Sequence, residues 1–174
     1  MLEIEAKARL KDFEKLKEKI LDMGGEYIKK EVQIDTYFNH PSRDFAKTDE
    51  ALRVRKVGGD IFLAYKGPKL DKLTKTREEI EVKVGDLKKP EEILRKVGFR
   101  EVLTIEKERE CFRIKDLYLM LDDVKGLGKF VEIEKRADNY EPEEMVDFLK
   151  ELGVDEGDIE RKSYLELMLE RRLL

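Results

Sequence analysis

The stretch Leu2-Glu3-Ile4-Glu5-Ala6-Lys7 alternates apolar and charged side chains. A period of two is typical of a β-strand whose two faces meet different surroundings. The two glutamates and the lysine would share one face, with about 7 Å between successive positions. The stretch therefore predicts a strand that presents paired carboxylates on its polar side.

The same alternation recurs along most of the chain and predicts eight strands. Gly58-Gly59-Asp60 marks a tight hairpin turn between the third and fourth strands, and Lys115-Asp116 marks another turn. We expect the strands at residues 1–10, 27–38, 50–57, 60–66, 75–84, 99–113, 117–125 and 128–137.

Four segments instead have the spacing of amphipathic helices. The first, at about 12–23, has Asp12 as its expected N-cap and ends at Gly24-Gly25. Two more follow Pro90 and Pro142, because proline suits the first turn of a helix. The last is expected at about 158–171, with Tyr164 docking it on the rest of the fold.

The opening motif has two further copies, which indicate an internal repeat. Glu3-Ile4-Glu5-Ala6-Lys7 returns as Glu79-Ile80-Glu81-Val82-Lys83 and, one residue shorter, as Glu132-Ile133-Glu134-Lys135. A charged helix that ends at glycine follows each copy. Three strand–helix units and eight strands predict an α+β fold: one domain over 1–174, a closed eight-stranded antiparallel barrel with helices packed on its outside.

Closure would turn the polar strand faces into a lumen. Two carboxylates about 7 Å apart repel by roughly 2.4 kcal/mol at an effective dielectric constant of 20, so several such pairs need cations nearby. Interleaved Arg and Lys supply some of that charge, and bound Mg²⁺ or Mn²⁺ would supply the rest. Such a lumen suits a polyphosphate–metal complex. A sheet with its polar face in water is the alternative that the alternation leaves open.

Composition narrows the range of partners. The chain has 37 Lys+Arg and 41 Asp+Glu, a net charge of -4, which argues against a general nucleic-acid binder. A single cysteine, Cys111, excludes an intramolecular disulfide, and no apolar run reaches the length of a membrane span. We expect a cytoplasmic protein without a membrane partner; abundant Lys and Glu also suit a thermophilic source.

Glu3-x-Glu5-x-Lys7 at the start of the chain resembles the signature of the CYTH superfamily, which joins class IV adenylate cyclases with thiamine triphosphatases and other triphosphate tunnel enzymes. The likeness extends over nearly the whole chain through ordered motifs. These include Leu52-Arg53-Val54-Arg55, Tyr65-Lys66-Gly67-Pro68, Glu106-Lys107-Glu108-Arg109 and Leu121-Asp122-Asp123-Val124. The resemblance independently implies an antiparallel tunnel barrel.

The resemblance also implies residue roles. It makes Glu3, Glu5, Glu132 and Glu134 ligands of Mg²⁺ or Mn²⁺, with Asp122 as a further candidate. It assigns triphosphate binding to the basic residues Lys7, Arg53, Arg55, Lys66, Arg77, Lys107 and Arg109. It places Glu3, Glu5, Lys7, Lys107 and Arg109 in catalysis, and Glu79 and Glu81 in the lumen.

Three functions stay open at this point. The motifs around Lys66 and Asp122 resemble the cyclase-like branch, which favours conversion of ATP to cyclic AMP and pyrophosphate. Hydrolysis of thiamine triphosphate, tripolyphosphate or a nucleoside triphosphate is the alternative, and a non-catalytic polyphosphate-binding module is the least favoured. The cyclase-like relatives suggest a homodimer, whereas the physiological triphosphate, the general base and the number of metals are not predicted.

Overall fold

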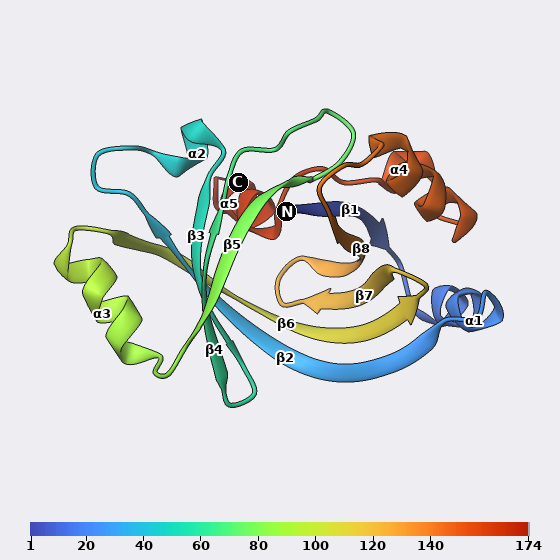
Figure 1. The fold of residues 1–174 in the computed structure, drawn as a ribbon, viewed down its shortest axis with the longest axis horizontal. Coiled ribbons are helices and arrows are strands. Elements are labelled where there is room, and N and C mark those ends of the chain that lie inside the picture. The colour runs from blue at the N-terminus through green and yellow to red at the C-terminus, as the bar shows by residue number, and fades with distance from the viewer. Residues whose placement is uncertain (174) are drawn as a thin grey trace.

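Eight antiparallel strands close into a barrel in the computed structural model, which describes residues 1–173 (Figure 1). Around the barrel the order is β1-β5-β4-β3-β2-β6-β7-β8, with β8 paired back to β1. The closed antiparallel barrel is thus confirmed, and every strand lies within two residues of its predicted bounds. The strands are β1 (Leu2–Leu10), β2 (Glu26–Asn39), β3 (Ala51–Val57), β4 (Asp60–Lys66), β5 (Arg77–Val84), β6 (Arg100–Ile114), β7 (Leu117–Val124) and β8 (Gly128–Ala137).

The three strands that carry the repeated motif are neighbours in the barrel. β1 lies between β5 and β8 and pairs with both. The helices α1 (Glu14–Asp22), α3 (Lys88–Lys96) and α4 (Pro142–Glu151) follow these strands. Each is succeeded by a glycine with positive φ: Gly24 at 85°, Gly98 at 101° and Gly153 at 88°. The repeat therefore brings its glutamates to one wall of the barrel.

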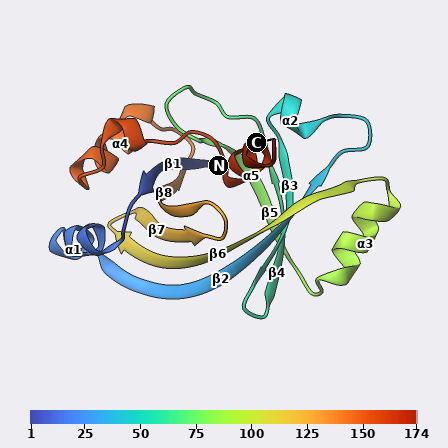
Figure 2. The ribbon, with the colours of Figure 1, turned by 180° about the vertical axis from the view of Figure 1, so that it is seen from behind.

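Outward-facing apolar residues bind the helices to the barrel. Ile4, Ala6 and Ala8 of β1 are buried together with residues of α1 and α4. On the other side, α3 packs its Leu94 against a smaller cluster around Val54 and Ile61, and the two groups of helices lie at opposite ends of the molecule (Figure 2). The predicted alternation is thus realised, because even-numbered β1 residues form the outer core while odd-numbered ones face inward.

The last helix, α5 (Tyr164–Arg172), differs from the others because it packs on inward-facing residues. Its Tyr164 and Leu167 are buried with Leu103 and Ile105, which lie on the same face of β6 as the cavity-lining Lys107. The short α2 (Phe45–Thr48), which the sequence did not predict, lies near α5 in both views (Figure 1) (Figure 2). One end of the lumen is therefore filled by apolar side chains.

Two predicted helix starts were wrong. The last helix begins at Tyr164 rather than near Asp158, because Ile159 bridges to Ala8 of β1 and Ser163 forms a capping box with Glu166. In α1, Phe13 rather than Asp12 is the N-cap residue. Asp12 still serves the helix start, since its carboxylate accepts a hydrogen bond from the backbone N–H of Glu14 at 3.2 Å.

None of the helices within residues 1–173 has the length and apolar character needed to cross a membrane.

Candidate active site

A charged cavity occupies the part of the lumen that α5 leaves free. Among the described residues, eight basic and six acidic side chains line it, a formal excess of two positive charges. Tyr37, Tyr164 and Ser163 complete the lining. The basic set is Arg53, Arg55, Lys66, Lys75, Arg77, Lys107, Arg109 and Arg136; the acidic set is Glu3, Glu5, Glu79, Glu81, Glu132 and Glu134.

Three of the predicted metal-binding carboxylates converge at one point of this cavity. Glu5 of β1 lies directly opposite Glu134 of β8 in the strand register, and Glu3 is two residues away on the same face. Each of the three offers a carboxylate oxygen within 4.8 Å of the others. Glu3 and Glu5 are almost fully buried. We name Glu3, Glu5 and Glu134 the acidic trio.

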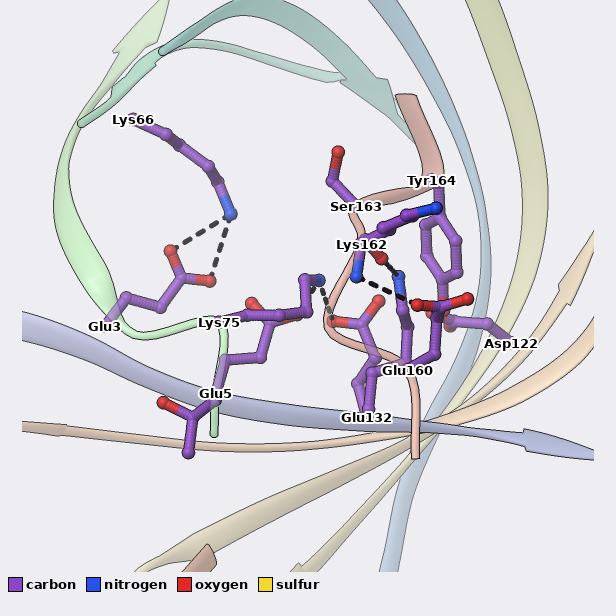
Figure 3. Close-up of polar contacts among 12 residues, drawn as sticks. Glu3, Glu5, Lys66, Lys75, Asp122, Glu132, Glu160, Lys162, Ser163 and Tyr164 are labelled. Carbon is purple, nitrogen blue, oxygen red and sulfur yellow. Dashed lines mark hydrogen bonds and ion pairs between the residues drawn. The ribbon is translucent and has the colours of Figure 1, made fainter. Parts of the chain in front are cut away.

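Glu132, the fourth predicted ligand, lies on the other side of Glu5 and next to cations. Lys75 makes an ion pair with Glu5 and lies 3.7 Å from Glu132 (Figure 3). Arg109 approaches the other oxygen of Glu132 at 3.6 Å. The Lys75 ammonium therefore already occupies the space between two carboxylates.

Burial and crowding give these carboxylates different proton affinities. Burial, followed by the charge of Glu132, raises the pKa of Glu5 to about 8. Burial alone would raise the pKa of Glu132 as well, but Lys75 and Arg109 more than offset it and hold that pKa well below its ordinary value. Burial and the charge of Glu3 raise the pKa of Glu134. Of these two neighbouring carboxyl groups, Glu5 therefore has the higher proton affinity and Glu132 the lower one.

The acidic trio fits a divalent cation by its chemistry. Mg²⁺ and Mn²⁺ prefer hard oxygen ligands, and three carboxylates supply them. Lys66 Nζ donates to Glu3 Oε1 at 3.1 Å, whereas the buried Glu3 Oε2 has no hydrogen-bond partner among residues 1–173. Lys66 Nζ is also 3.1 Å from that second oxygen, but without the geometry of a hydrogen bond. A buried acceptor left in this state is costly, and a metal ion would satisfy it.

Two buried aspartates orient two of the predicted phosphate-binding arginines. Arg55 donates to both oxygens of Asp35 at 2.7 and 2.8 Å, and Arg109 donates to both oxygens of Asp122 at 2.7 Å. Burial would raise the pKa of Asp35, but Arg55 more than offsets it and keeps the carboxylate charged. The bidentate geometry holds each guanidinium plane in a fixed direction.

The remaining predicted cations reach the cavity with fewer partners. Arg53 donates to Glu81 at 3.3 Å, and its buried Nε has no hydrogen-bond partner in the described chain. Lys107 lies 3.9 Å from Asp35. Burial and the charge of Arg109 lower the pKa of Lys107 to about 7. These donors are available to oxyanions of a ligand.

The structure places two predicted site residues outside the cavity lining. Lys7 is fully buried, donates to the backbone carbonyl of Lys162, and lies 4.2 Å from the ring centroid of Tyr164. Asp122 is equally buried and accepts from Arg109 and, at 2.7 Å, from the Tyr164 hydroxyl. Their positions favour orienting roles behind the cavity wall.

Sequence reasoning missed several contributors, among them Arg136 of the cavity lining. Lys75 shares the strand phase of Arg77, which could have identified it, although β5 itself begins at Arg77. Asp35 carries no signal of its own until its pairing with Arg55 is known. Tyr164 docks α5 as predicted, but it also contacts three ammonium groups, those of Lys7, Lys75 and Lys107. That convergence depends on tertiary packing alone.

Comparison with known proteins gives consistent matches over the full fold. A family model described as "CYTH domain" matches residues 1–164. A Methanocaldococcus jannaschii protein named "Putative adenylate cyclase MJ0240" is 47% identical over 172 residues, covering 96% of this chain and 98% of its own. The solved structure of the PH1819 protein from Pyrococcus horikoshii is 44% identical, with a TM-score of 0.88 and coverage of 98% of this chain and 99% of its own.

A third relative is more distant. The solved structure of a Hippeastrum protein, described as "Putative adenylyl cyclase HpAC1" with "a dominant triphophatase activity", has a TM-score of 0.65. It is 22% identical and covers 98% of this chain and 95% of its own, and at this identity the likeness shows a shared fold alone.

Proposed function

The chain belongs to the CYTH family, whose members act on triphosphates, and from that premise we propose that it is a divalent-metal-dependent enzyme of the class IV adenylate cyclase type. The reaction would convert ATP to cyclic AMP and pyrophosphate. The observation that carries the proposal is the meeting of the acidic trio with the basic lining in one cavity.

The charges of the cavity match such a ligand. An ATP–metal complex carries a net negative charge, and the lining has a formal excess of two positive charges. The acidic trio would hold Mg²⁺ or Mn²⁺, which would neutralise charge on the phosphates and lower the barrier to attack at phosphorus. Arg53, Lys66 and Lys107 would bind the phosphate oxygens that remain.

The two arginines that aspartates orient would also stabilise negative charge on the phosphates. In the proposed reaction the ribose 3′-hydroxyl attacks the α-phosphorus in line, and pyrophosphate leaves. Arg55 and Arg109, each fixed by a bidentate aspartate, would hold the departing charge in a constant geometry. Lys7 and Asp122 would position these groups through Tyr164 and Arg109.

Hydrolysis is the second candidate function. The same contacts would hold thiamine triphosphate, tripolyphosphate or a nucleoside triphosphate while water attacks instead of a ribose hydroxyl. The description of the Hippeastrum protein as dominantly a triphosphatase makes this alternative concrete. A binding module without catalysis has the least support, since binding an anion alone needs fewer carboxylates in the lining.

Product analysis separates these functions. The protein is incubated with ATP, thiamine triphosphate and tripolyphosphate, each with Mg²⁺ or Mn²⁺, and the products are resolved by chromatography. We expect cyclic AMP and pyrophosphate from ATP. Release of orthophosphate without any cyclic product would establish hydrolysis instead, and metal-dependent binding without turnover would establish the module.

Two substitutions test the metal site itself. Glu5→Gln and Glu134→Gln should each abolish metal-dependent turnover while the circular dichroism spectrum stays unchanged. Glu106→Gln on the exposed outer face of β6 is the matched control and should retain full activity. Full activity in both lumen variants would remove the metal assignment.

A further inference from the structure

Lys75 is a cavity-lining cation that lies between two carboxylates. It comes just before β5, at the end of the connection from β4, and its side chain is almost fully buried. Its ammonium group forms an ion pair with Glu5 Oε1 and lies 3.7 Å from Glu132 Oε2 (Figure 3). Glu5 belongs to β1 and Glu132 to β8. Lys75 therefore bridges two neighbouring strands of the barrel from a third segment of the chain.

The main chain fixes Lys75 beside the same glutamate that its ammonium group contacts. The backbone N–H of Lys75 donates to the carbonyl of Glu5 at 2.8 Å, and the backbone N–H of Glu5 donates to Thr76 Oγ1 at 3.4 Å. Thr74 and Thr76, on either side of Lys75, are both buried, and Thr74 Oγ1 donates to Thr76 Oγ1 at 2.7 Å. These contacts hold the backbone of Lys75 against β1.

The connection that carries Lys75 is itself anchored to two distant segments. Asp71 accepts hydrogen bonds from the backbone N–H groups of Leu73 and Thr74 at 2.8 and 2.6 Å. It also accepts one from the hydroxyl of Tyr140, which precedes α4, at 2.7 Å. Arg161, which precedes α5, donates through Nε to the carbonyl of Thr74 at 3.2 Å. Lys75 is therefore a fixed cation of the cavity wall rather than a mobile counter-ion.

A fixed ammonium group at this place competes with a divalent ion. Mg²⁺ and Mn²⁺ bind where carboxylate oxygens converge, and without Lys75 the pair Glu5 and Glu132 would offer such a place next to the acidic trio. The ammonium group already lies between these two carboxylates, and like charges repel strongly in a buried site. Glu5 can still bind an ion at the acidic trio, because a carboxylate has about four lone-pair sites. The geometry thus leaves room for a metal ion on one side of Glu5 and not on the other.

We propose that Lys75 is the second cation of this site: it neutralises Glu5 and Glu132 in place of a second metal ion, so that the cavity binds a single Mg²⁺ or Mn²⁺ at the acidic trio. The inference rests on the proposed metal-dependent function. In sites with two metal ions, the pair stabilises the attacking and the leaving oxygen of the reacting phosphate. Here the ammonium group, which has three N–H donors, would donate to a phosphate oxygen where the second ion would otherwise bind.

The number of Mn²⁺ ions bound per chain is the first test. It is determined by equilibrium dialysis at saturating Mn²⁺, once with Mn²⁺ alone and once with tripolyphosphate on both sides of the membrane. The unmodified protein should bind one ion in each condition. Lys75→Met, which removes the charge but keeps much of the side-chain length, should bind two. Lys75→Arg, which restores the positive charge, should bind one again.

A double variant locates the added ion. Lys75→Met combined with Glu132→Gln should bind one ion, because the place beside Glu5 has then lost a ligand. Lys72→Met is the matched control: Lys72 lies on the same connection with an exposed side chain, and its loss should leave the number of ions unchanged. Circular dichroism compares the fold of each variant with that of the unmodified protein.

Failure of the metal-dependent function and failure of the Lys75 proposal give different results. Absence of bound Mn²⁺ from the unmodified protein, with and without tripolyphosphate, would overturn the metal-dependent function itself. Two ions per chain in the unmodified protein, which needs no substitution, would overturn only the role of Lys75. A single ion in folded Lys75→Met would do the same. Two ions in the double variant would place the added ion away from Glu132 and would also contradict the proposal.

Discussion

Single residues of the lumen have proton affinities that make binding dependent on pH. The pKa of about 8 at Glu5 and of about 7 at Lys107 both arise chiefly from burial. They act in opposite ways, because burial favours the neutral form of each group and one is an acid while the other is a base. A cation that binds beside Glu5 should therefore cause release of a proton, whereas an anion that binds beside Lys107 should cause uptake of one.

The Glu5 carboxyl should lower the stability of the metal-free protein as pH rises. The folded state holds the Glu5 proton up to about pH 8, whereas a glutamate of the unfolded chain loses it at about pH 4.3. The free energy of unfolding should fall between pH 6 and pH 8.5 by on the order of 2 kcal/mol through this group. Glu5→Gln should flatten that decline, and urea unfolding at several pH values measures it.

The effect of Mg²⁺ on the free energy of unfolding at different pH values tests the same group. Binding at the acidic trio requires a deprotonated Glu5, so Mg²⁺ should stabilise the protein more at pH 8.5 than at pH 6.5. Glu106→Gln, a surface change, should leave the whole pH profile as it was. An unchanged slope in Glu5→Gln would show that the proton lies elsewhere.

Lys107 should take up a proton when a phosphate ligand binds. At pH 8 an amine with a pKa of about 7 is mostly neutral, and an oxyanion beside it raises that pKa. Calorimetry of tripolyphosphate binding in buffers of different ionisation enthalpy should therefore show uptake at pH 8 that declines toward pH 6. Lys107→Gln should lose that component; retention of the full uptake would assign it to another group.

At the scale of elements, α5 fills one end of the barrel lumen with apolar side chains and carries Tyr164 beside the cavity. Leu167 is 6% exposed within the inward cluster, while Leu173 at the end of the same helix is 88% exposed. Leu167→Ala should lower the free energy of unfolding by about 2–5 kcal/mol because it leaves a cavity in a packed cluster. Leu173→Ala should change it by less than about 0.5 kcal/mol. Chemical denaturation measures the free energy of unfolding of both variants. Equal effects would mean that the packing of Leu167 in the lumen contributes nothing to stability.

The sequence predicts a structural feature well when local geometry determines it, and poorly when tertiary contacts do. Period-two alternation separated Glu3 and Glu5 from Ile4 and Ala6 correctly, because strand geometry alone decides which face a residue takes. The start of α5 could not be predicted in this way, since the contact of Ile159 with Ala8 competes with helix formation.

The grouping of the carboxylates required the order of the strands. Four glutamates were predicted as equivalent ligands, yet the strand register brings Glu3, Glu5 and Glu134 together, and the carboxylate of Glu132 is not part of that group. The pairing of Asp35 with Arg55 likewise depends on which strands become neighbours. No local pattern encodes these choices.

At the scale of the whole molecule, the barrel has one weak seam. β1 and β8 share nine register pairs, but β1 and β5 share only two, Leu2 with Glu78 and Glu3 with Arg77. Few backbone hydrogen bonds hold this seam closed, so local opening there should cost less than elsewhere. The acidic trio and Arg77 lie on its two sides.

Hydrogen exchange should reveal the seam directly. Amides of β5 should exchange faster than those of β8 in the free protein, since β5 lacks a fully paired neighbour on one side. Mg²⁺ with tripolyphosphate should slow exchange in β5 because the ligand would contact both sides. Amides of β7, paired along both edges, serve as the internal reference and should not respond. Equal protection of β5 and β8 without ligand would contradict the idea.

The pairing of β1 with β8 also has a consequence for folding. Glu5 and Glu134 face each other across the register although more than a hundred residues separate them in the chain. Contacts of such long range form late, because the loop that they close is entropically expensive. Partly folded chains, on the ribosome or after stress, would therefore lack the assembled acidic trio, and the capacity to capture metal and nucleotide would arise only with completion of the barrel.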